Sequence, residues 1–163
     1  MRLVLAADST YGNTRRVAEA IADGWPSESR DPPTPIWDLD ARRLDSEALL
    51  VVGAPTHAHG VDSATWTALE RIPSDRFRDL RVATFDTRYD RSRWLTGSAA
   101  HDLEKALIAR GARSVTPPES FFVVERDGPL ESGELERARA WGARLYEIAS
   151  VPTRPLAVVG NLA

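Results

Sequence analysis

The sequence predicts a single α/β domain built on a five-stranded parallel sheet. Short apolar runs alternate along the chain with longer segments whose apolar residues recur at helical spacing. The most apolar run, 48–54, has no polar face, as a central parallel strand covered on both sides requires. Its 163 residues suit one compact domain. Right-handed crossovers then place helices on both faces, and the usual order for five such strands is 2-1-3-4-5.

The first half of the chain supplies three of the expected strands. In order, we expect a strand at 2–7, a helix at 13–25, a polar loop at 27–35, an edge strand at 36–39, a central strand at 48–54 and a helix at 63–72. Gly24 and Pro26 end the first helix, and Asp62 or Ser63 caps the second. Each helix carries its apolar residues on one face, so each packs on the sheet along one side.

The second half completes the sheet with two strands and two helices. We expect a strand at 81–86, a helix that Gly97 or Ser98 opens and Gly111 closes, a last strand in two parts at 114–116 and 120–124, and a last helix at 134–149. Pro117 and Pro118 interrupt the last strand, because proline lacks a backbone donor. We assign residues 1–150 to this domain and treat 151–163 as a C-terminal tail whose placement the sequence does not indicate.

Composition excludes several classes of protein. A net charge of −3 gives no basic face for nucleic acid, and the absence of cysteine excludes disulfides and thiolate chemistry. No apolar run approaches the roughly 20 residues of a membrane span, and the N-terminus lacks the features of a signal peptide. We therefore expect a cytoplasmic protein that is monomeric and contacts neither membrane nor nucleic acid.

The loop after the first strand is the sharpest signal for a binding site. In an open parallel sheet, ligands bind beyond the carboxyl ends of strands one, three and four, at loops 8–14, 55–62 and 86–97. The first loop consists of Ser9, Thr10, Tyr11, Gly12, Asn13 and Thr14. Its backbone N–H groups, hydroxyls and helix start suit a phosphate, although it matches neither the Walker A nor the dinucleotide pattern. The alternative is a capped helix start that binds nothing.

These residues carry a resemblance to a known family. Residues 8–14 and the helix that follows resemble the phosphate loop of flavodoxins, and the similarity continues in 50–56 and 82–86. By this match, Ser9, Thr10, Gly12, Asn13 and Thr14 hold the phosphate of FMN. Tyr11 stands where the family usually has threonine, so only its N–H remains for the phosphate. The resemblance implies a three-layer flavodoxin-like fold with FMN as cofactor.

The same resemblance assigns the other two loops to the flavin ring. Pro55, Thr56 and His57 would contact the ring edge, or else be plain loop residues. His57 and His59 alternate like metal ligands, but no third ligand is apparent because His101 lies in a predicted helix. The third loop begins at Asp86, and its Thr87 and Arg88 would donate to the polar edge of the ring. Tyr89 or Trp94 would stack on the ring, or would instead pack against the neighbouring helix.

Positive charge in the third loop sets this chain apart from flavodoxins, which usually surround the flavin with acidic residues. Six arginines and three aspartates lie between Arg76 and Trp94. If they surround the flavin, they make its hydroquinone less strongly reducing. We expect replacement of Arg88, Arg91 and Arg93 to lower the potential. The alternative is a solvated rim with no effect on the flavin.

Three functions compete. The first is an electron carrier that binds FMN and shuttles electrons between redox partner proteins. The second is a small FMN-dependent NAD(P)H:quinone-type reductase, and the third is an interaction module without flavin. A response-regulator receiver is excluded because Gly53, Ala54 and Pro55 stand where it needs an aspartate. A serine hydrolase is excluded because the chain lacks the Gly-x-Ser-x-Gly motif.

Overall fold

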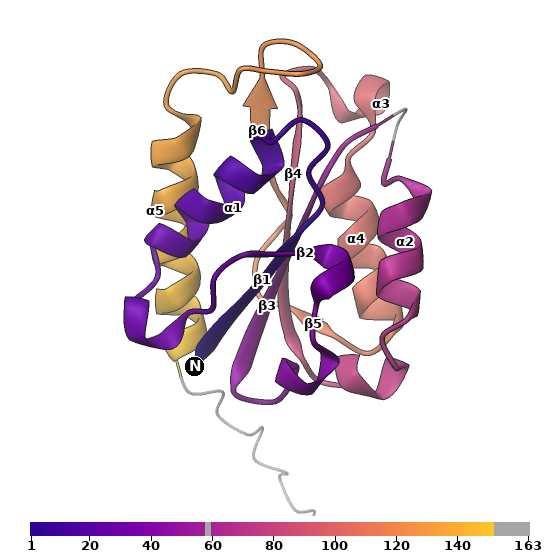
Figure 1. Ribbon diagram of the computed structural model, residues 1–163, viewed down its shortest axis with the longest axis vertical. Coiled ribbons are helices and arrows are strands. Elements are labelled where there is room, and N and C mark those ends of the chain that lie inside the picture. Colours follow the sequence, from indigo (N-terminus) through magenta and orange to yellow (C-terminus); the bar gives the residue numbers. More distant parts are fainter. Residues whose placement is uncertain (58–59, 152–163) are drawn as a thin grey trace, which may run out of the picture.

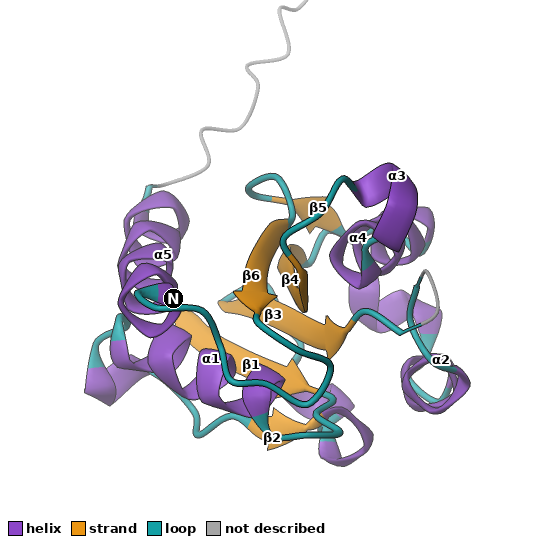
Figure 2. Cartoon of the chain, turned by 90° about the horizontal axis from the view of Figure 1, so that it is seen from above, coloured by secondary structure: helices purple, strands orange, loops and turns teal. Residues whose placement is uncertain are grey.

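A parallel sheet lies between two pairs of helices in the computed structural model, which describes residues 1–57 and 60–151 (Figures 1 and 2). Its strands are β1 (Arg2–Ala7), β2 (Thr34–Pro35), β3 (Ala48–Pro55), β4 (Arg81–Tyr89), β5 (Arg113–Ser114) and β6 (Glu119–Val123). The strand order is β2-β1-β3-β4-β5, and β6 also pairs with β4. Every pairing between these strands is parallel. The predicted order 2-1-3-4-5 is confirmed, with the last position divided between β5 and β6.

Helices cover both faces of the sheet. They are α1 (Asn13–Asp23), α2 (Ser63–Glu70), α3 (Arg93–Thr96), α4 (Ala99–Ala109) and α5 (Glu134–Ser150), with short 3₁₀ turns at Ser27–Ser29, Ile36–Asp38, Ala41–Arg43 and Ser74–Phe77. Helices α1 and α5 lie on one face and α2 and α4 on the other, as Figure 2 shows from above. No helix in residues 1–57 and 60–151 is long and apolar enough to cross a bilayer.

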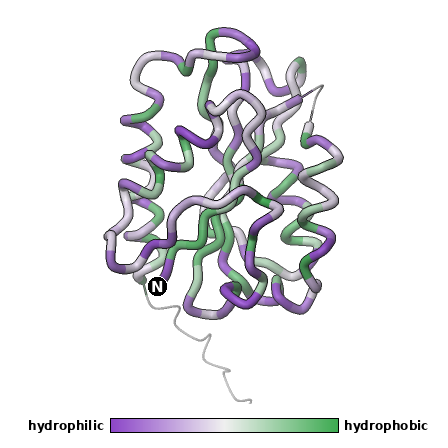
Figure 3. The backbone as a smooth tube through the Cα atoms, in the orientation of Figure 1, coloured by the Kyte–Doolittle hydropathy of each residue, from purple (hydrophilic) through white to green (hydrophobic). Residues whose placement is uncertain are grey.

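The core consists of two apolar clusters, one on each face of the sheet. Because successive strand residues point to opposite faces, Leu3 and Leu5 pack toward α1 and α5, whereas Val4 and Ala6 pack toward α2 and α4. The strands form a hydrophobic centre in Figure 3, and hydrophilic residues concentrate on the outer surfaces of the helices and in the loops. This double coverage explains the continuous apolar run of β3.

Two glycines allow α1 and α5 to pack backbone against backbone. A Cβ atom on Gly142 would overlap the carbonyl oxygen of Ile21, and one on Gly24 would overlap that of Arg139. The two helices therefore approach more closely than helices with larger side chains at the contact.

The structure differs from the sequence prediction at the first sheet edge and at the third loop. The prediction of a strand at 36–39 is wrong. Strand β2 is Thr34–Pro35, and the next residues, Ile36–Asp38, form a 3₁₀ turn that buries Ile36. Strand β4 continues beyond the predicted 86 to Tyr89, because its last residues pair with β6. The segment predicted as loop also contains α3. The 152–163 part of the predicted tail lies outside the described residues.

Candidate functional site

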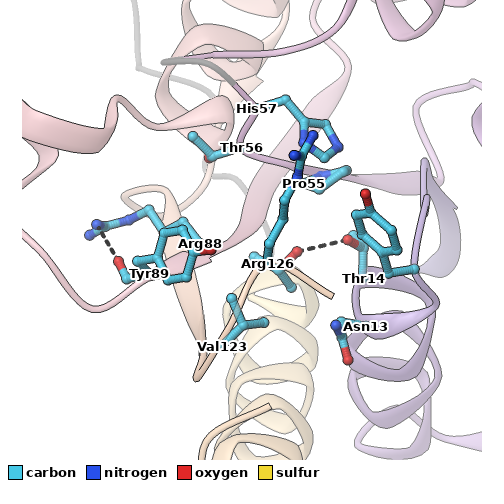
Figure 4. A pocket seen from close by; sticks show the side chains of 11 residues that line it. Asn13, Thr14, Pro55, Thr56, His57, Arg88, Tyr89, Val123 and Arg126 are labelled. Atoms are coloured by element: carbon cyan, nitrogen blue, oxygen red, sulfur yellow. Dashed lines mark hydrogen bonds between the residues drawn. The ribbon is translucent and has the colours of Figure 1, made fainter. Parts of the chain in front are cut away.

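A cleft opens at the carboxyl ends of the central strands. Figure 4 shows the side chains that line it, which come from the start of α1, the ends of β3 and β4, and the connection after β6. The lining residues are Tyr11, Asn13, Thr14, Pro55, Thr56, His57, Thr87, Arg88, Tyr89, Val123 and Arg126. All three loops singled out in the sequence therefore meet at one cleft.

The first loop presents unpaired backbone donors at the start of α1. Gly12 precedes the helix with a φ of 86°, a conformation that favours glycine. The Ser9 hydroxyl accepts a hydrogen bond from the Arg15 N–H at 3.1 Å. In the part of the chain that the structure describes, nothing accepts from the N–H groups of residues 11–14. Four donors at the positive end of a helix form a site suited to an anion.

Two hydroxyl contacts tie the first loop to the other two. Thr10 Oγ1 lies 3.3 Å from His57 Nε2, joining the first and second loops. Thr14 Oγ1 lies 2.8 Å from Thr87 Oγ1, and both residues are buried. Thr10 stands at the exposed rim rather than among the cleft-lining side chains. These two contacts fix the positions of the three loops relative to one another.

Asp86 and Thr56 support the start of α4 beneath the cleft. The fully buried Asp86 Oδ2 accepts from the Thr56 hydroxyl at 3.1 Å, the Ser98 hydroxyl at 2.6 Å and the Ala100 N–H at 3.1 Å. The Thr56 hydroxyl in turn accepts from the Ala99 N–H at 2.9 Å. The hydroxyl of Thr56 is thus already engaged as donor and acceptor, and Asp86 lies below the wall of the cleft rather than in it.

The Arg88 guanidinium points away from Thr14 and Asn13 (Figure 4), and its side chain is largely buried. Its Nε donates to Ser120 at 3.0 Å, and its Nη1 donates to the carbonyl oxygens of Tyr89 at 3.2 Å and Arg91 at 2.6 Å. Its Nε also lies 3.9 Å from Asp86 Oδ1, which has no hydrogen-bond donor among the described residues. Arg88 therefore holds the segment between β4 and α3 in place.

The two aromatic residues predicted to stack take different positions. Tyr89 lines the cleft and is 39% exposed, whereas Trp94 lies on α3 outside the cleft lining and is 88% exposed. Of the two aromatic residues, Tyr89 is the one that lines the cleft.

Two cleft residues, Val123 and Arg126, were missed in the sequence. Both lie outside the loops that follow the first, third and fourth strands, where the strand order predicts a site. Because β6 pairs with the end of β4, the connection after it reaches the same edge of the sheet. The run Glu125-Arg126-Asp127-Gly128-Pro129, a polar turn after a predicted strand, was the available signal.

Two carboxyl groups interact beside the first loop. Burial raises the pKa of Asp8, and the nearby negative charge of Asp62 raises it further against the opposing hydrogen bond from Thr65. The Thr65 hydroxyl donates to Asp8 Oδ2 at 3.0 Å, and its N–H donates to Asp62 Oδ1 at 2.8 Å. The pKa of Asp62 is lowered: although burial opposes this, hydrogen bonds from Thr65 outweigh it. By accepting from the Thr65 N–H, Asp62 caps α2, so that Asp62 rather than Ser63 is the predicted cap that the structure confirms.

A metal centre finds no support among the described residues. Residues 1–57 and 60–151 contain no group of three or more His, Asp or Glu side chains that could hold an ion. His101 hydrogen-bonds to Ser98 at 3.0 Å, and burial together with the positive charge of Arg93 lowers its pKa. His59, the other residue of the alternating pair, lies outside the described residues.

Comparison with known proteins is consistent with this geometry. A family model described as Flavodoxin matches residues 6–141. A flavodoxin from the domain Archaea superposes with a TM-score of 0.73 at 19% identity, covering 91% of this chain and 99% of that one. Flavodoxin 1 from Bacillus cereus gives 0.69 at 21% identity, covering 94% and 100%. A flavodoxin, WrbA-like protein from Agrobacterium tumefaciens gives 0.64 at 21%, covering 91% and 96%. No curated protein matches significantly.

Proposed function

Because the chain belongs to the flavodoxin family, we propose that it binds FMN and carries electrons between redox partner proteins. The observation that carries the proposal is the set of four N–H groups at the start of α1 that find no acceptor among the described residues and open on a cleft formed by all three loops. An anion of the size of a phosphate satisfies such donors without a lysine. FMN, when bound, supplies one-electron and two-electron chemistry.

Each part of the cleft has an expected role toward FMN. The N–H groups of residues 11–14 would bind the phosphate, with the hydroxyl of Thr10 beside them. The backbone of 55–57 and of 87–89 would contact the ribityl chain and the ring edge. The Ser9 hydroxyl accepts from the Arg15 N–H, which leaves its own O–H free to donate to the phosphate. The 39% exposure of Tyr89 at the cleft wall supports stacking on the ring.

The carrier is favoured over a reductase because Tyr89 occupies one wall of the cleft. A ring covered in this way exposes only its edge, which suffices for electron transfer between proteins. A reductase needs open space above the ring for its substrate. Steady oxidation of NADH or NADPH by the purified protein with a quinone acceptor would favour the reductase instead.

The direct test is binding of FMN to the purified apoprotein. Calorimetric and fluorescence titrations should show one FMN per chain with quenched flavin fluorescence. Riboflavin should bind much more weakly, because it lacks the phosphate that the α1 donors would bind. An absence of binding at micromolar FMN would overturn the proposal. Equal affinity for FMN and riboflavin would contradict the placement of the phosphate.

A further inference from the structure

Arg126 lies at the tip of a well-defined turn between β6 and α5. The Val124 N–H donates to the Pro129 carbonyl at 2.9 Å, and the Gly128 N–H donates to that of Glu125 at 3.1 Å. Val123 and Leu130 form an antiparallel bridge below the turn. The position from which the Arg126 side chain extends is therefore fixed by backbone hydrogen bonds.

The same turn is seated on the first turn of α1. A Cβ atom on Gly128 would lie only 2.7 Å from Asn13 Nδ2, so the backbone of the turn rests directly against the Asn13 side chain. Gly128 also has a φ of 104°, which favours glycine. Since Asn13 belongs to the set of residues with unpaired N–H groups, Arg126 begins close to the expected anion site.

The Arg126 side chain extends into the cleft toward His57 and Pro55 (Figure 4). His57 is the residue whose Nε2 contacts Thr10 of the first loop. Among the described residues, no carboxylate lies within ion-pair distance of Arg126. Arg88, by contrast, is paired with Asp86, and Arg137 with Glu119 and Glu134. Of the two arginines that line the cleft, only Arg126 retains an uncompensated charge.

We propose that Arg126 binds the phosphate of the flavin nucleotide and sets the preference of the site for FMN over riboflavin. This inference rests on the proposed function, because it assumes that FMN occupies the cleft. A phosphate monoester carries a charge between −1.5 and −2 at neutral pH. The planar guanidinium donates two parallel hydrogen bonds to such a group. The α1 donors supply partial charges, and Arg126 adds one full positive charge.

The test compares FMN with riboflavin in wild type and three variants. Arg126→Gln removes the charge, and Arg126→Lys keeps it without the planar fork. Arg91→Gln is the matched control, because Arg91 is exposed, lies outside the cleft lining and gives the same change in net charge. Thermal unfolding of each apoprotein establishes that the variants are folded. Dissociation constants are measured by fluorescence titration at low and high ionic strength.

We expect Arg126→Gln to weaken FMN binding about 10- to 100-fold, as for loss of a hydrogen bond to a charged group, and to leave riboflavin binding unchanged. The salt dependence of FMN binding should fall in the same variant, because one charge no longer contributes. Arg126→Lys should recover part of the affinity for FMN. Arg91→Gln should leave both affinities unchanged.

Three results would overturn the inference while the proposed function stands. The first is an FMN affinity that Arg126→Gln leaves unchanged. The second is an equal loss of affinity for FMN and for riboflavin, which would place the guanidinium against the ring or ribityl chain. The third is a lowered hydroquinone potential with an unchanged ratio of FMN to riboflavin affinity, which would assign the charge to the reduced ring. Failure of wild type to bind FMN would overturn both proposals.

Discussion

Thr14 and Thr87 share a buried hydrogen bond that joins the first turn of α1 to the end of β4. The two hydroxyl oxygens lie 2.8 Å apart, and neither side chain has another hydrogen bond among the described residues. A buried hydroxyl that loses its partner retains the cost of desolvation. The Thr14 hydroxyl therefore stabilises the walls of the cleft before any ligand binds.

Replacing Thr14 by valine, which keeps its shape, should lower the free energy of unfolding by about 1–3 kcal/mol. The loss arises because the Thr87 hydroxyl is left buried without a partner. The double variant Thr14→Val/Thr87→Val should recover part of this loss, since both polar groups are then gone. Urea unfolding of the apoproteins measures the difference. A double variant whose loss equals the sum of the single losses would show that the hydrogen bond contributes nothing.

Asp8→Asn should stabilise the apoprotein at neutral pH. Since the pKa of Asp8 is raised in the folded state, the folded protein holds this proton more tightly than the unfolded chain. Stability therefore falls as pH rises from the ordinary value of 3.8 through the folded-state pKa, and stays lower above it. Asparagine removes that loss while keeping an oxygen for Thr65.

The advantage of Asp8→Asn should thus be largest at pH 7 and vanish toward pH 3.8. Urea unfolding across this pH range measures it. The exposed Asp90→Asn provides a control for the change in net charge. A constant difference between Asp8→Asn and wild type at every pH would refute the explanation.

The close contact between α1 and α5 requires that residue 142 is glycine, which has no side chain. Gly142→Ala places a methyl group on the Ile21 carbonyl oxygen, a backbone atom that cannot rotate away. We expect a loss of stability of about 3 kcal/mol, at the upper end for overpacked sites, because the helices must separate. Gly133→Ala is the control: its Cβ meets nothing within 4 Å, and its positive φ alone costs about 1–2 kcal/mol. Similar losses for the two variants would show that crowding is not the cause.

The segment between β4 and α3 depends on Arg88. Arg88→Gln should destabilise the protein by on the order of 3 kcal/mol, since it leaves the buried Asp86 without its charge partner. Hydrogen exchange at residues 90–96 should accelerate, because the guanidinium no longer holds the Tyr89 and Arg91 carbonyls. Adding Asp86→Asn to Arg88→Gln should reduce the loss of stability. An unchanged exchange rate in 90–96 would exclude the role given to Arg88.

The sequence predicted the helices and strands better than it predicted the contacts between side chains. Periodicity and alternation depend on neighbours along the chain, so the buried strands, the helix faces and the strand order were accessible. The edge strand was placed wrongly because its two residues carry no alternation to detect. The roles of Arg88 and Arg126 depend on partners that meet only when β6 pairs with β4. Such partners leave no periodic signal in one sequence.

The charge distribution of the whole molecule reduces the redox effect expected from the third-loop arginines. Of the six between Arg76 and Trp94, three precede or begin β4, at the end of the sheet away from the cleft. Arg88 is balanced by Asp86, which leaves Arg91 and Arg93, both exposed. Arg93 also contacts His101, and the exposed carboxylate of Asp90 lies beside both arginines in the sequence.

Replacing Arg91 and Arg93 by glutamine should therefore lower the semiquinone–hydroquinone potential of the FMN-loaded protein by about 20 mV or less per charge. This corresponds to a charge about 10 Å away acting through water. The shift should disappear at high salt. Redox titrations of wild type and the double variant at two ionic strengths measure it. A shift of about 70 mV per charge would show that these charges act on the ring through protein, at an effective dielectric of about 20, rather than through water.

The sheet ends on very short strands at both sides. On one side β2 has two residues, and Pro35 has no N–H to offer; on the other, β5 and β6 divide the last position and leave no long continuous edge. The Leu130 bridge to Val123 further covers β6. A strand from a second molecule needs a row of free N–H and C=O groups, and neither side provides one. In residues 1–57 and 60–151, the short edge strands thus disfavour edge-to-edge strand pairing between molecules.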